Sequence, residues 1–524
     1  MEKKISIVRA AGIVSIFTLL SRIFGLARDI IIATIFPKAA TDAFFVAFTI
    51  PNVLRRLLAE GALTVSFIPV FSDYRKKSRE ESVDFVSAAF TVTAIVVAVV
   101  SIIGILVSPL LVWLFAAGYR SDPVKFSMTV DLTRIMFPYI FFVSLMALSM
   151  GVLNTLGHFV APAAAPVFLN LTLIIIGVAS PFIAKMLGIP AIHVLAWGVL
   201  LGGIFQFLVQ LPPMVSRGHA PKFKPDFRHP GVKKILLLMG PSLFGLAVYQ
   251  VTIILSRLLA SFLESGANSY MYYSQRLIEF PMGVFAVAIA TAAMPNLSSD
   301  ASDGQIEKLK QTLRDTISLT FYVIIPSMIG LLTITIPIVA IFFQRGRFDY
   351  NMTIQTSKSL AAFALGLPAM ALTRQLVPAF YALKDSKTPV KASFIALLAY
   401  IVCGLSLMWP LGHAGLALAI TVSSWVNAVF LIFMLNKKIG SVGFKTISGD
   451  VLKMCLSAAV MGLAAWICSL PGNWKAGGNN KWNILILLFS LCVSGIVYFI
   501  ATGAMGLSHS RRISATLKRK ILRR

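Results

Sequence analysis

The sequence predicts an all-α membrane protein that crosses the bilayer many times. Its 524 residues are 57% hydrophobic and only 13% charged, with a mean hydropathy of +0.84, whereas an ordinary soluble chain is about 25% charged. Apolar stretches of about 20 residues recur along the whole sequence, and each could span a bilayer as a helix. The short alternating segments typical of a membrane β-barrel do not occur in the sequence. We therefore expect about 14 transmembrane helices.

Each expected helix is an apolar stretch that ends where charged residues, proline or glycine interrupt it. The first half of the chain predicts helices at Ala10–Phe36, Asp42–Phe71, Val83–Ala116, Val130–Leu156, Ala161–Leu187, Ala191–Met214 and Ile235–Leu263. The second half predicts helices at Ser269–Leu297, Ile317–Phe343, Leu360–Leu383, Val390–Leu411, Ala414–Leu435, Val451–Leu470 and Trp482–Met505. An even number of spans places both termini on the same side of the membrane.

The basic residues predict which side that is. Most of the Lys and Arg outside the spans lie in alternate loops and at the two termini, and cytoplasmic loops carry such an excess. Both termini are therefore expected in the cytoplasm. The net charge of +27 is therefore explained mostly by residues that set the topology and contact anionic membrane lipids. For this reason we expect no nucleic-acid partner. The basic loops are at 75–79, 215–234, 308–314, 384–391 and 437–445.

The domain organisation is predicted from one long loop and a weak internal repeat. The segment from Ala40 resembles the segment from Ala267, and each ends in a Pro-x-x-Ser sequence. Chance likeness between apolar helices is the alternative explanation, but two similarly oriented bundles around a cavity are typical of transporters. The predicted parts are an N-terminal lobe of helices 1–6 (1–216), a cytoplasmic linker (217–234), a C-terminal lobe of helices 7–12 (235–440), and two extra helices with a basic tail that could lie on the membrane surface (441–524).

Charged residues within the first two spans point to the function. A charge at the bilayer centre costs between ~3 and ~17 kcal/mol, so these side chains are expected to face a water-filled cavity or one another. An excess of arginine in such a cavity predicts an anion site, because the guanidinium fork binds phosphate bidentately and stays charged. The charged residues are Arg22, Arg28, Asp29, Asp42, Arg55, Arg56 and Glu60.

Spacing predicts how some of these charges pair. Arg56 and Glu60 are four residues apart, so this arginine is expected to be partly neutralised within its own helix. Arg28 and Arg55 have no obvious local partner. In the second half of the chain Arg276 and Glu279 repeat the cation-plus-acid spacing, and Arg374 lies mid-span between Pro368 and Pro378. Structural ion pairs between helices, or arginines that reach toward the interface, are the alternative for each cation.

No motif predicts an enzyme. The chain has no Walker-type phosphate loop, so ATP is not expected to drive it directly, and none of its histidines has the spacing of a zinc site. A membrane-embedded enzyme would need clustered acids or a metal site, and a purely scaffolding role would leave the intramembrane arginines unexplained.

Five segments form long and specific motifs: SRIFGLARD, TDAFFVAFTIPNVLRRLLAEGALTVSFIPVF, MYYSQRLIEFPMGVFAVAIATAAMPNLS, YALKDSKTPVK and GHAGLALA. Together they resemble the MurJ (MviN) family of bacterial lipid II flippases over nearly the whole chain. The resemblance implies the fold of the MATE/multidrug–oligosaccharidyl-lipid–polysaccharide exporter superfamily, with two six-helix lobes in a V around a central cationic cavity. Two further C-terminal helices, the last two predicted spans, would border a groove for a polyprenyl tail.

The resemblance also implies the activity. The expected substrate is lipid II, an undecaprenyl-pyrophosphate that carries the disaccharide-pentapeptide, flipped from the cytoplasmic to the periplasmic leaflet of the inner membrane for peptidoglycan synthesis. Alternating access is the expected mechanism. The expected pyrophosphate-binding residues are Arg22, Arg28, Arg55, Arg276 and Arg374, and the acids expected to position them are Asp29, Asp42, Glu60 and Glu279.

Two features of the sequence depart from the family. Gln275 stands where some members carry Asp. Some members bind sodium through acids on the seventh and eleventh spans, but the expected seventh span has no acid and only Asp385 is a weak candidate nearby. We therefore expect no metal site and no cofactor, with the membrane potential as a candidate driving force.

A monomer is expected, with other cell-wall synthesis proteins as candidate partners. A flippase for another polyprenyl-linked glycan, or a MATE-like exporter of small molecules, stays open as the alternative function.

Overall fold

A computed structural model describes residues 7–57 and 63–511, and within these ranges the chain is helical and contains no strand. It divides into two compact units, Met1–Ser269 and Tyr270–Arg524. The prediction of an all-α fold is confirmed. The expected surface helix in the basic tail and the acid Glu60 lie outside the described residues.

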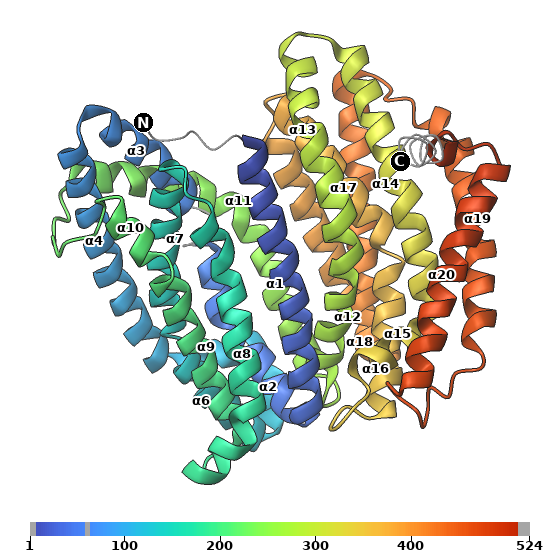
Figure 1. Ribbon diagram of the computed structural model, residues 1–524, viewed down its shortest axis with the longest axis horizontal. Helices are drawn as coiled ribbons and strands as arrows, with labels where there is room; N and C mark the ends of the chain where they lie inside the picture. The colour runs from blue at the N-terminus through green and yellow to red at the C-terminus, as the bar shows by residue number, and fades with distance from the viewer. Residues whose placement is uncertain (1–6, 58–62, 512–524) are drawn as a thin grey trace, which may run out of the picture. The chain divides into compact units, whose positions relative to one another are not determined.

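The first unit is built from the helices drawn in blue to green in Figure 1. Their ends carry ordinary signals: Ser78 accepts the N–H of Glu81 at the start of α4, and Gly188 ends α8 in the left-handed conformation with φ 66°. The helices are α1 (Ile7–Ile35), α2 (Lys38–Arg55), α3 (Thr64–Lys77), α4 (Arg79–Leu106), α5 (Ser108–Ala116), the 3₁₀ helix η2 (Ala117–Ser121), α6 (Pro123–Met136), α7 (Tyr139–Thr155), α8 (Val160–Leu187), α9 (Ala191–Leu208), α10 (Leu211–Ser216) and α11 (Pro230–Ser261).

Two apolar clusters hold this unit together. One joins α3, α4 and α7 around the stacked rings of Phe67, Phe71 and Phe85. The other joins α2, α5 and α6, with Ile253 and Ile254 of α11 packed against it. Helices α8 and α9 pack along each other, and α1 packs on α8, as Figure 1 shows.

The second unit continues the chain. Helix α12 (Ala267–Pro281) begins at the end of the first unit and passes through a π-helical segment, η3 (Met282–Ala286), into α13 (Val287–Ser302). The other helices are α14 (Ile306–Thr333), α15 (Thr335–Phe343), α16 (Tyr350–Ala364), α17 (Leu367–Ala382), α18 (Lys387–Ile439), α19 (Phe444–Ser469) and α20 (Lys481–Ala504). Helices α19 and α20, in red in Figure 1, pack along each other, and α19 packs on α14.

Where helices of the second unit bend, polar side chains form hydrogen bonds with the backbone carbonyls. Helices α16 and α17 meet at a bend of 44°, and the carbonyls freed there accept hydrogen bonds from Thr421 and Trp425. Such pairing is required at membrane depth, where an unpaired carbonyl is costly. Helix α18 is itself two helices that meet at Gly412, whose φ of 58° and ψ of −139° end the first one.

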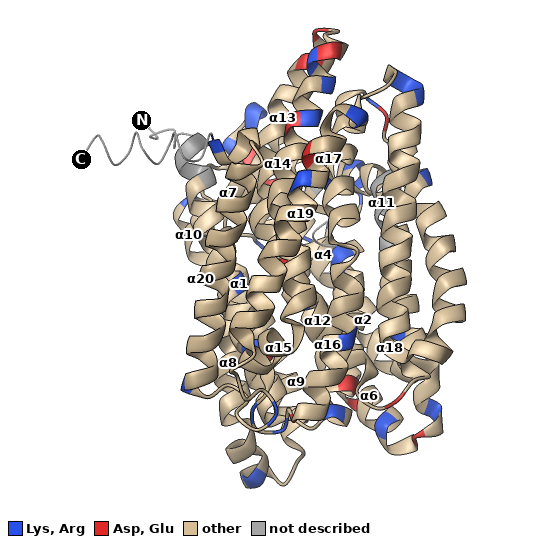
Figure 2. Ribbon diagram, turned by 90° about the vertical axis from the view of Figure 1, so that its right-hand side faces the viewer, with Lys and Arg blue, Asp and Glu red and all other residues tan. Residues whose placement is uncertain are grey.

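As far as the structure describes them, the fourteen apolar stretches expected from the sequence fall on these helices, but the count of fourteen spans is not confirmed. In the described residues nine helices are long and apolar enough to cross a membrane, or ten if the bent α16–α17 pair is one span. Figure 2 shows α20 almost without charged residues along its length, whereas charges gather near the end of α13.

The boundary between the two compact units differs in position from the expected linker at 217–234, and the expected lobes stay a prediction. The loop 217–234 lies against α4 of the first unit, and α11, expected in the second lobe, packs on α3, α4 and α5. The boundary between the units therefore comes after Ser269. Apolar periodicity identified α11 as a helix but carried no information on which neighbours it would pack against.

The two copies of the suspected repeat share a local form. In both, an α-helix that carries arginine is followed by π-helical turns, at Arg56 and Leu57 in the first and at Met282–Ala286 in the second. Such turns are rare and often mark functional sites. The shared form supports a duplication.

Candidate functional site

The candidate site of the first unit is centred on a buried arginine. Arg28 of α1 is 5% exposed, and its Nε and Nη2 both donate to Oδ1 of the fully buried Asp29, at 2.9 and 2.7 Å. Its Nη1 donates to Oδ1 of Asn170 on α8 at 3.0 Å. The Asn170 amide in turn donates to the backbone oxygen of Ser21 at 3.0 Å. The guanidinium is thus oriented by side chains of two helices that pack along each other.

This arrangement corrects one expectation. Arg28 does have a local partner, because the adjacent Asp29 reaches back to its fork, and it has a distant one in Asn170. The amide of Asn170 was missed because one asparagine in an apolar helix gives no signal by itself. The carboxylate of Asp29 beside the buried guanidinium favours the charged form of Arg28.

The second predicted arginine also has a local partner. Nε of Arg55 donates to Oδ1 of Asn52 at 3.0 Å, and the Asn52 amide donates to the Phe48 carbonyl. This side chain is half-buried, as is Arg22 on α1, whereas Arg56 is exposed. The described helix is π-helical directly after Arg55, which re-aims the side chains that follow.

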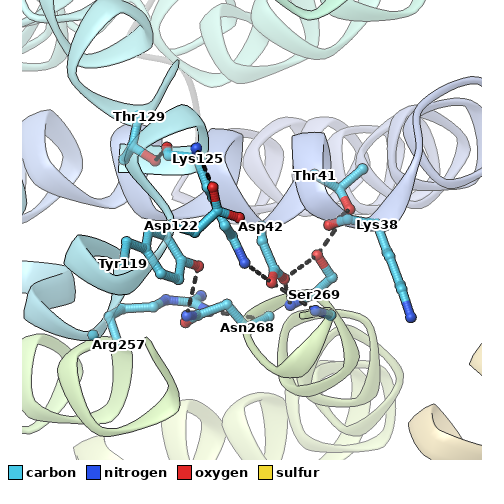
Figure 3. Close-up of polar contacts among 12 residues, drawn as sticks. Lys38, Thr41, Asp42, Tyr119, Asp122, Lys125, Thr129, Arg257, Asn268 and Ser269 are labelled. Atoms are coloured by element: carbon cyan, nitrogen blue, oxygen red, sulfur yellow. Dashed lines mark hydrogen bonds and ion pairs between the residues drawn. The ribbon is translucent and has the colours of Figure 1, made fainter. Parts of the chain in front are cut away.

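Asp42 is at the centre of the polar cluster in Figure 3. Its carboxylate is 1% exposed and accepts hydrogen bonds from Nζ of Lys125 at 2.8 Å and from the backbone N–H of Gly266 at 2.7 Å. The N–H and the hydroxyl of Ser269 donate to it as well, at 2.8 and 2.7 Å. A carboxylate from α2 therefore caps the N-terminus of α12, where the N–H groups have no partner in their own helix.

A second layer supports this cap. Nζ of Lys125 lies 4.1 Å from the ring centre of Tyr119, and the Tyr119 hydroxyl accepts a hydrogen bond from Asn268 at 3.0 Å. Arg257 donates to the backbone oxygen of Asn268 at 3.1 Å (Figure 3). In this structure the carboxylate of Asp42 is bound to a lysine and a helix end. Lys125 was missed because the sequence reading placed it in a loop before the fourth span.

The second unit presents its own cations. Nη1 of Arg276 on α12 contacts the Glu279 carboxylate at 2.9 Å, which confirms the predicted pair, and the guanidinium lies 5.8 Å from the ring centre of Tyr272. The side chains of Arg276 and Glu279 are 29% and 51% exposed. Ser274 donates to the carbonyl of Thr356 on α16 at 2.8 Å, which fixes α12 against that helix.

Two cations of the second unit are exposed at membrane depth. Arg374 lies mid-way along α17, and Lys358 lies mid-way along α16. Neither has an ion pair or side-chain hydrogen bond to another residue in the described part of the chain. Lys358 was missed because the predicted span began at Leu360, whereas the helix begins at Tyr350. Cations of this kind need water or an anion.

The weak sodium candidate is occupied by protein donors. The Asp385 carboxylate lies between α17 and α18, accepts Nζ of Lys438 at 2.8 Å and caps α18 through the N–H and hydroxyl of Thr388. The hydrogen bond from Lys438 is the main cause that lowers the pKa of Asp385 to about 2. Among the described residues no group of three or more His, Cys, Asp or Glu is placed to hold a metal ion.

Comparison with known proteins gives consistent results. A family model described as "Lipid II flippase MurJ" matches residues 31–478. The lipid II flippase MurJ of Burkholderia cenocepacia is 39% identical over 514 residues, covering 96% of this chain and 98% of that protein. A probable lipid II flippase MurJ of Vibrio cholerae is 36% identical over 493 residues, covering 91% and 92% of the two chains.

Solved structures agree on the fold. A lipid II flippase MurJ in an inward closed conformation superposes with a TM-score of 0.77 and 28% identity, covering 94% of this chain and 98% of that chain. An inward-facing multidrug resistance MATE family transporter of the MOP superfamily gives a TM-score of 0.68 at 15% identity, covering 84% and 99%. The second likeness extends the shared fold to the superfamily.

Proposed function

The chain belongs to the lipid II flippase MurJ family, and from this membership and the arginines at membrane depth we propose that it flips lipid II for peptidoglycan synthesis. The substrate would move from the cytoplasmic to the periplasmic leaflet by alternating access. The observation that carries the proposal is Arg28, a 5% exposed guanidinium held in place by Asp29 and Asn170 within a membrane protein.

The pyrophosphate is the part of lipid II that suits these arginines. A guanidinium fork binds phosphate oxygens bidentately and keeps its charge when desolvated. We assign this role to Arg28, Arg55 and Arg276, with Arg22 and Arg374 in support. The transport reaction makes and breaks no covalent bond, so we propose no catalytic residue and no cofactor.

The acids have distinct roles in this proposal. Asp29 and Glu279 contact Arg28 and Arg276 directly, so each would orient its arginine and compete with the pyrophosphate, which prevents the substrate from being held too tightly. Asp42 would act through the backbone, by stabilising the N-terminus of α12 ten residues or fewer before Arg276. Glu60 is proposed as an acid of the same class as Glu279.

Charge distribution supports the orientation. We propose that both termini and the basic loops face the cytoplasm. The membrane potential would then act on the cationic carrier with about 2.3 kcal/mol per charge for each 100 mV, which favours its return toward the cytoplasm after substrate release. A monomer is the proposed working form.

The test is a leaflet-resolved assay of lipid II. In bacteria depleted of the native protein, variants Arg28→Gln and Arg276→Gln are expected to leave lipid II in the inner leaflet, measured with a probe that cannot cross the membrane. Arg134→Gln is the matched control, because Arg134 pairs with Asp131 on an exposed face at 3.6 Å. Wild-type outer-leaflet lipid II in either arginine variant would refute the assignment. Unchanged lipid II on depletion would instead favour another polyprenyl-linked glycan.

A further inference from the structure

The loop between α10 and α11 is held against the first unit by three hydroxyl and carboxylate side chains of α4. Ser87 accepts the backbone N–H of Lys222 at 3.1 Å, and Thr91 accepts the N–H of Lys224 at 2.8 Å. The ammonium of Lys224 bonds to the Asp84 carboxylate. These contacts lie along one side of α4, since their spacing is three to four residues. The loop backbone is therefore bound at regular intervals.

Two buried histidines complete the attachment. His219 is 5% exposed and lies 3.3 Å from the Ser82 hydroxyl, and His229 is 7% exposed and packs against the rings of Tyr74 and Phe85. Burial is the main cause that lowers the pKa of His219, which favours the uncharged ring in this apolar site. The underside of the loop is thus ordinary protein core.

The outward side of the same loop has a different character. Phe223 is 83% exposed and Phe227 is 53% exposed. Lys222 and Arg228 beside them are exposed as well. The half-buried Asp226 uses one carboxylate oxygen to accept the N–H of Arg228. Two aromatic rings flanked by cations, on a loop bound from beneath, form a surface that water solvates poorly and that attracts anions.

We propose that this loop is a membrane anchor, in which Phe223 and Phe227 enter the headgroup layer and Lys222 and Arg228 bind anionic lipid headgroups. The loop directly follows Ala191–Ser216, a helical stretch long and apolar enough to span a membrane, and a loop at the end of a span is expected at the bilayer surface. Aromatic rings favour this interface, and each cation near an anionic leaflet favours binding about fivefold, from about 1 kcal/mol. The inference goes beyond lipid II transport and rests on the proposed cytoplasmic side of the loop only for the identity of the leaflet.

The charge pattern favours lipid over a protein partner. The exposed charged side chains next to the two rings, Lys222 and Arg228, are cations, and the half-buried Asp226 accepts the N–H of Arg228. The nearby acids Asp84 and Asp73 are paired with Lys224 and Lys234. A rim with a net positive charge suits an anionic surface such as a leaflet that contains phosphatidylglycerol.

The experiment places a fluorescent reporter on the loop of the full chain. In a variant without the four native cysteines, Phe223→Cys is labelled with the polarity-sensitive dye NBD and reconstituted into vesicles of phosphatidylcholine, alone or mixed equally with phosphatidylglycerol. Ser302→Cys, at the exposed C-terminal end of α13, is the matched control. The dye at 223 is expected to emit at shorter wavelength in the mixed vesicles and to be quenched by nitroxide-bearing lipids, whereas the dye at 302 is quenched by iodide in water.

A second variant tests the cations. The double variant Lys222→Gln/Arg228→Gln should weaken binding of the loop to the mixed vesicles relative to phosphatidylcholine alone by up to about 25-fold, about fivefold for each cation. Both residues are exposed, so the substitutions should not affect folding. Equal lipid quenching in both vesicle types would overturn the anionic-lipid part. The anchor would be overturned if iodide quenched the dye at 223 as strongly as the dye at 302. It would also be overturned if neither iodide nor the nitroxide lipids quenched the dye at 223, because another protein would then cover the loop. None of these results depends on transport activity.

Discussion

Replacing Asp42 by asparagine should destabilise the first unit strongly. The substitution keeps one oxygen for Ser269 but turns an NH₂ group toward two donors, Nζ of Lys125 and the N–H of Gly266. It also leaves the Lys125 ammonium, 6% exposed, without its carboxylate. Removing one partner of a buried ion pair costs about 3–5 kcal/mol. We expect Asp42→Asn to lose that amount of unfolding free energy.

The assay is reversible unfolding in mixed micelles, followed by tryptophan fluorescence. The double variant Asp42→Asn/Lys125→Met removes both charges, and replacing a buried pair by apolar groups is often nearly neutral. It should therefore recover about half of the loss, leaving about 1–3 kcal/mol for the unpaired N–H of Gly266. The exposed pair Lys77–Glu81, with side chains 59% and 50% exposed, is the control, and Glu81→Gln should cost at most about 1 kcal/mol.

Two outcomes would refute this reasoning. One is a loss within about 1 kcal/mol of the control, which would mean that the carboxylate is not required for the cap. The other is a double variant less stable than Asp42→Asn, because the two substitutions would then act independently and the buried lysine would not be the source of the cost.

Three further predictions follow from the structure. Asp385 has a pKa lowered to about 2, so its contribution to stability is complete above its ordinary pKa near 4 and is lost as the pH falls toward 2. Asp385→Asn should therefore lower the melting temperature at neutral pH. In a series of melting curves it should also reduce the fall in melting temperature between pH 4 and pH 2. Gly118→Ala should cost about 1–3 kcal/mol, since its Cβ would overlap the Ser261 carbonyl, whereas Gly503→Ala, with nothing within 4 Å, should be neutral or stabilising in the same unfolding assay. Lys358→Gln should reduce lipid II transport in the leaflet assay without lowering the melting temperature, and Lys358→Arg should restore it; full activity in the glutamine variant would exclude a role in transport.

Much of the fold could be predicted from residues that are close together in the sequence. The apolar runs of membrane length fall on helices in the described residues, and the i,i+3 spacing of Arg276 and Glu279 predicted a pair that the structure contains at 2.9 Å. Boundaries were less accurate where the helix extends beyond its apolar part, as at Tyr350–Ala364, which is why Lys358 was placed in a loop.

Composition and apolar patterning were enough to predict a helical membrane protein with arginines where a bilayer disfavours them. Each of these properties depends on composition and on neighbours within a few turns of helix. The packing of the helices determines which distant groups meet: Arg28 with Asn170, 142 residues away, Asp42 with Lys125, 83 residues away, and the loop around Phe223 with α4. A buried polar group must find a partner, but its own sequence does not say which of many distant helices will supply one, because that depends on how the helices pack.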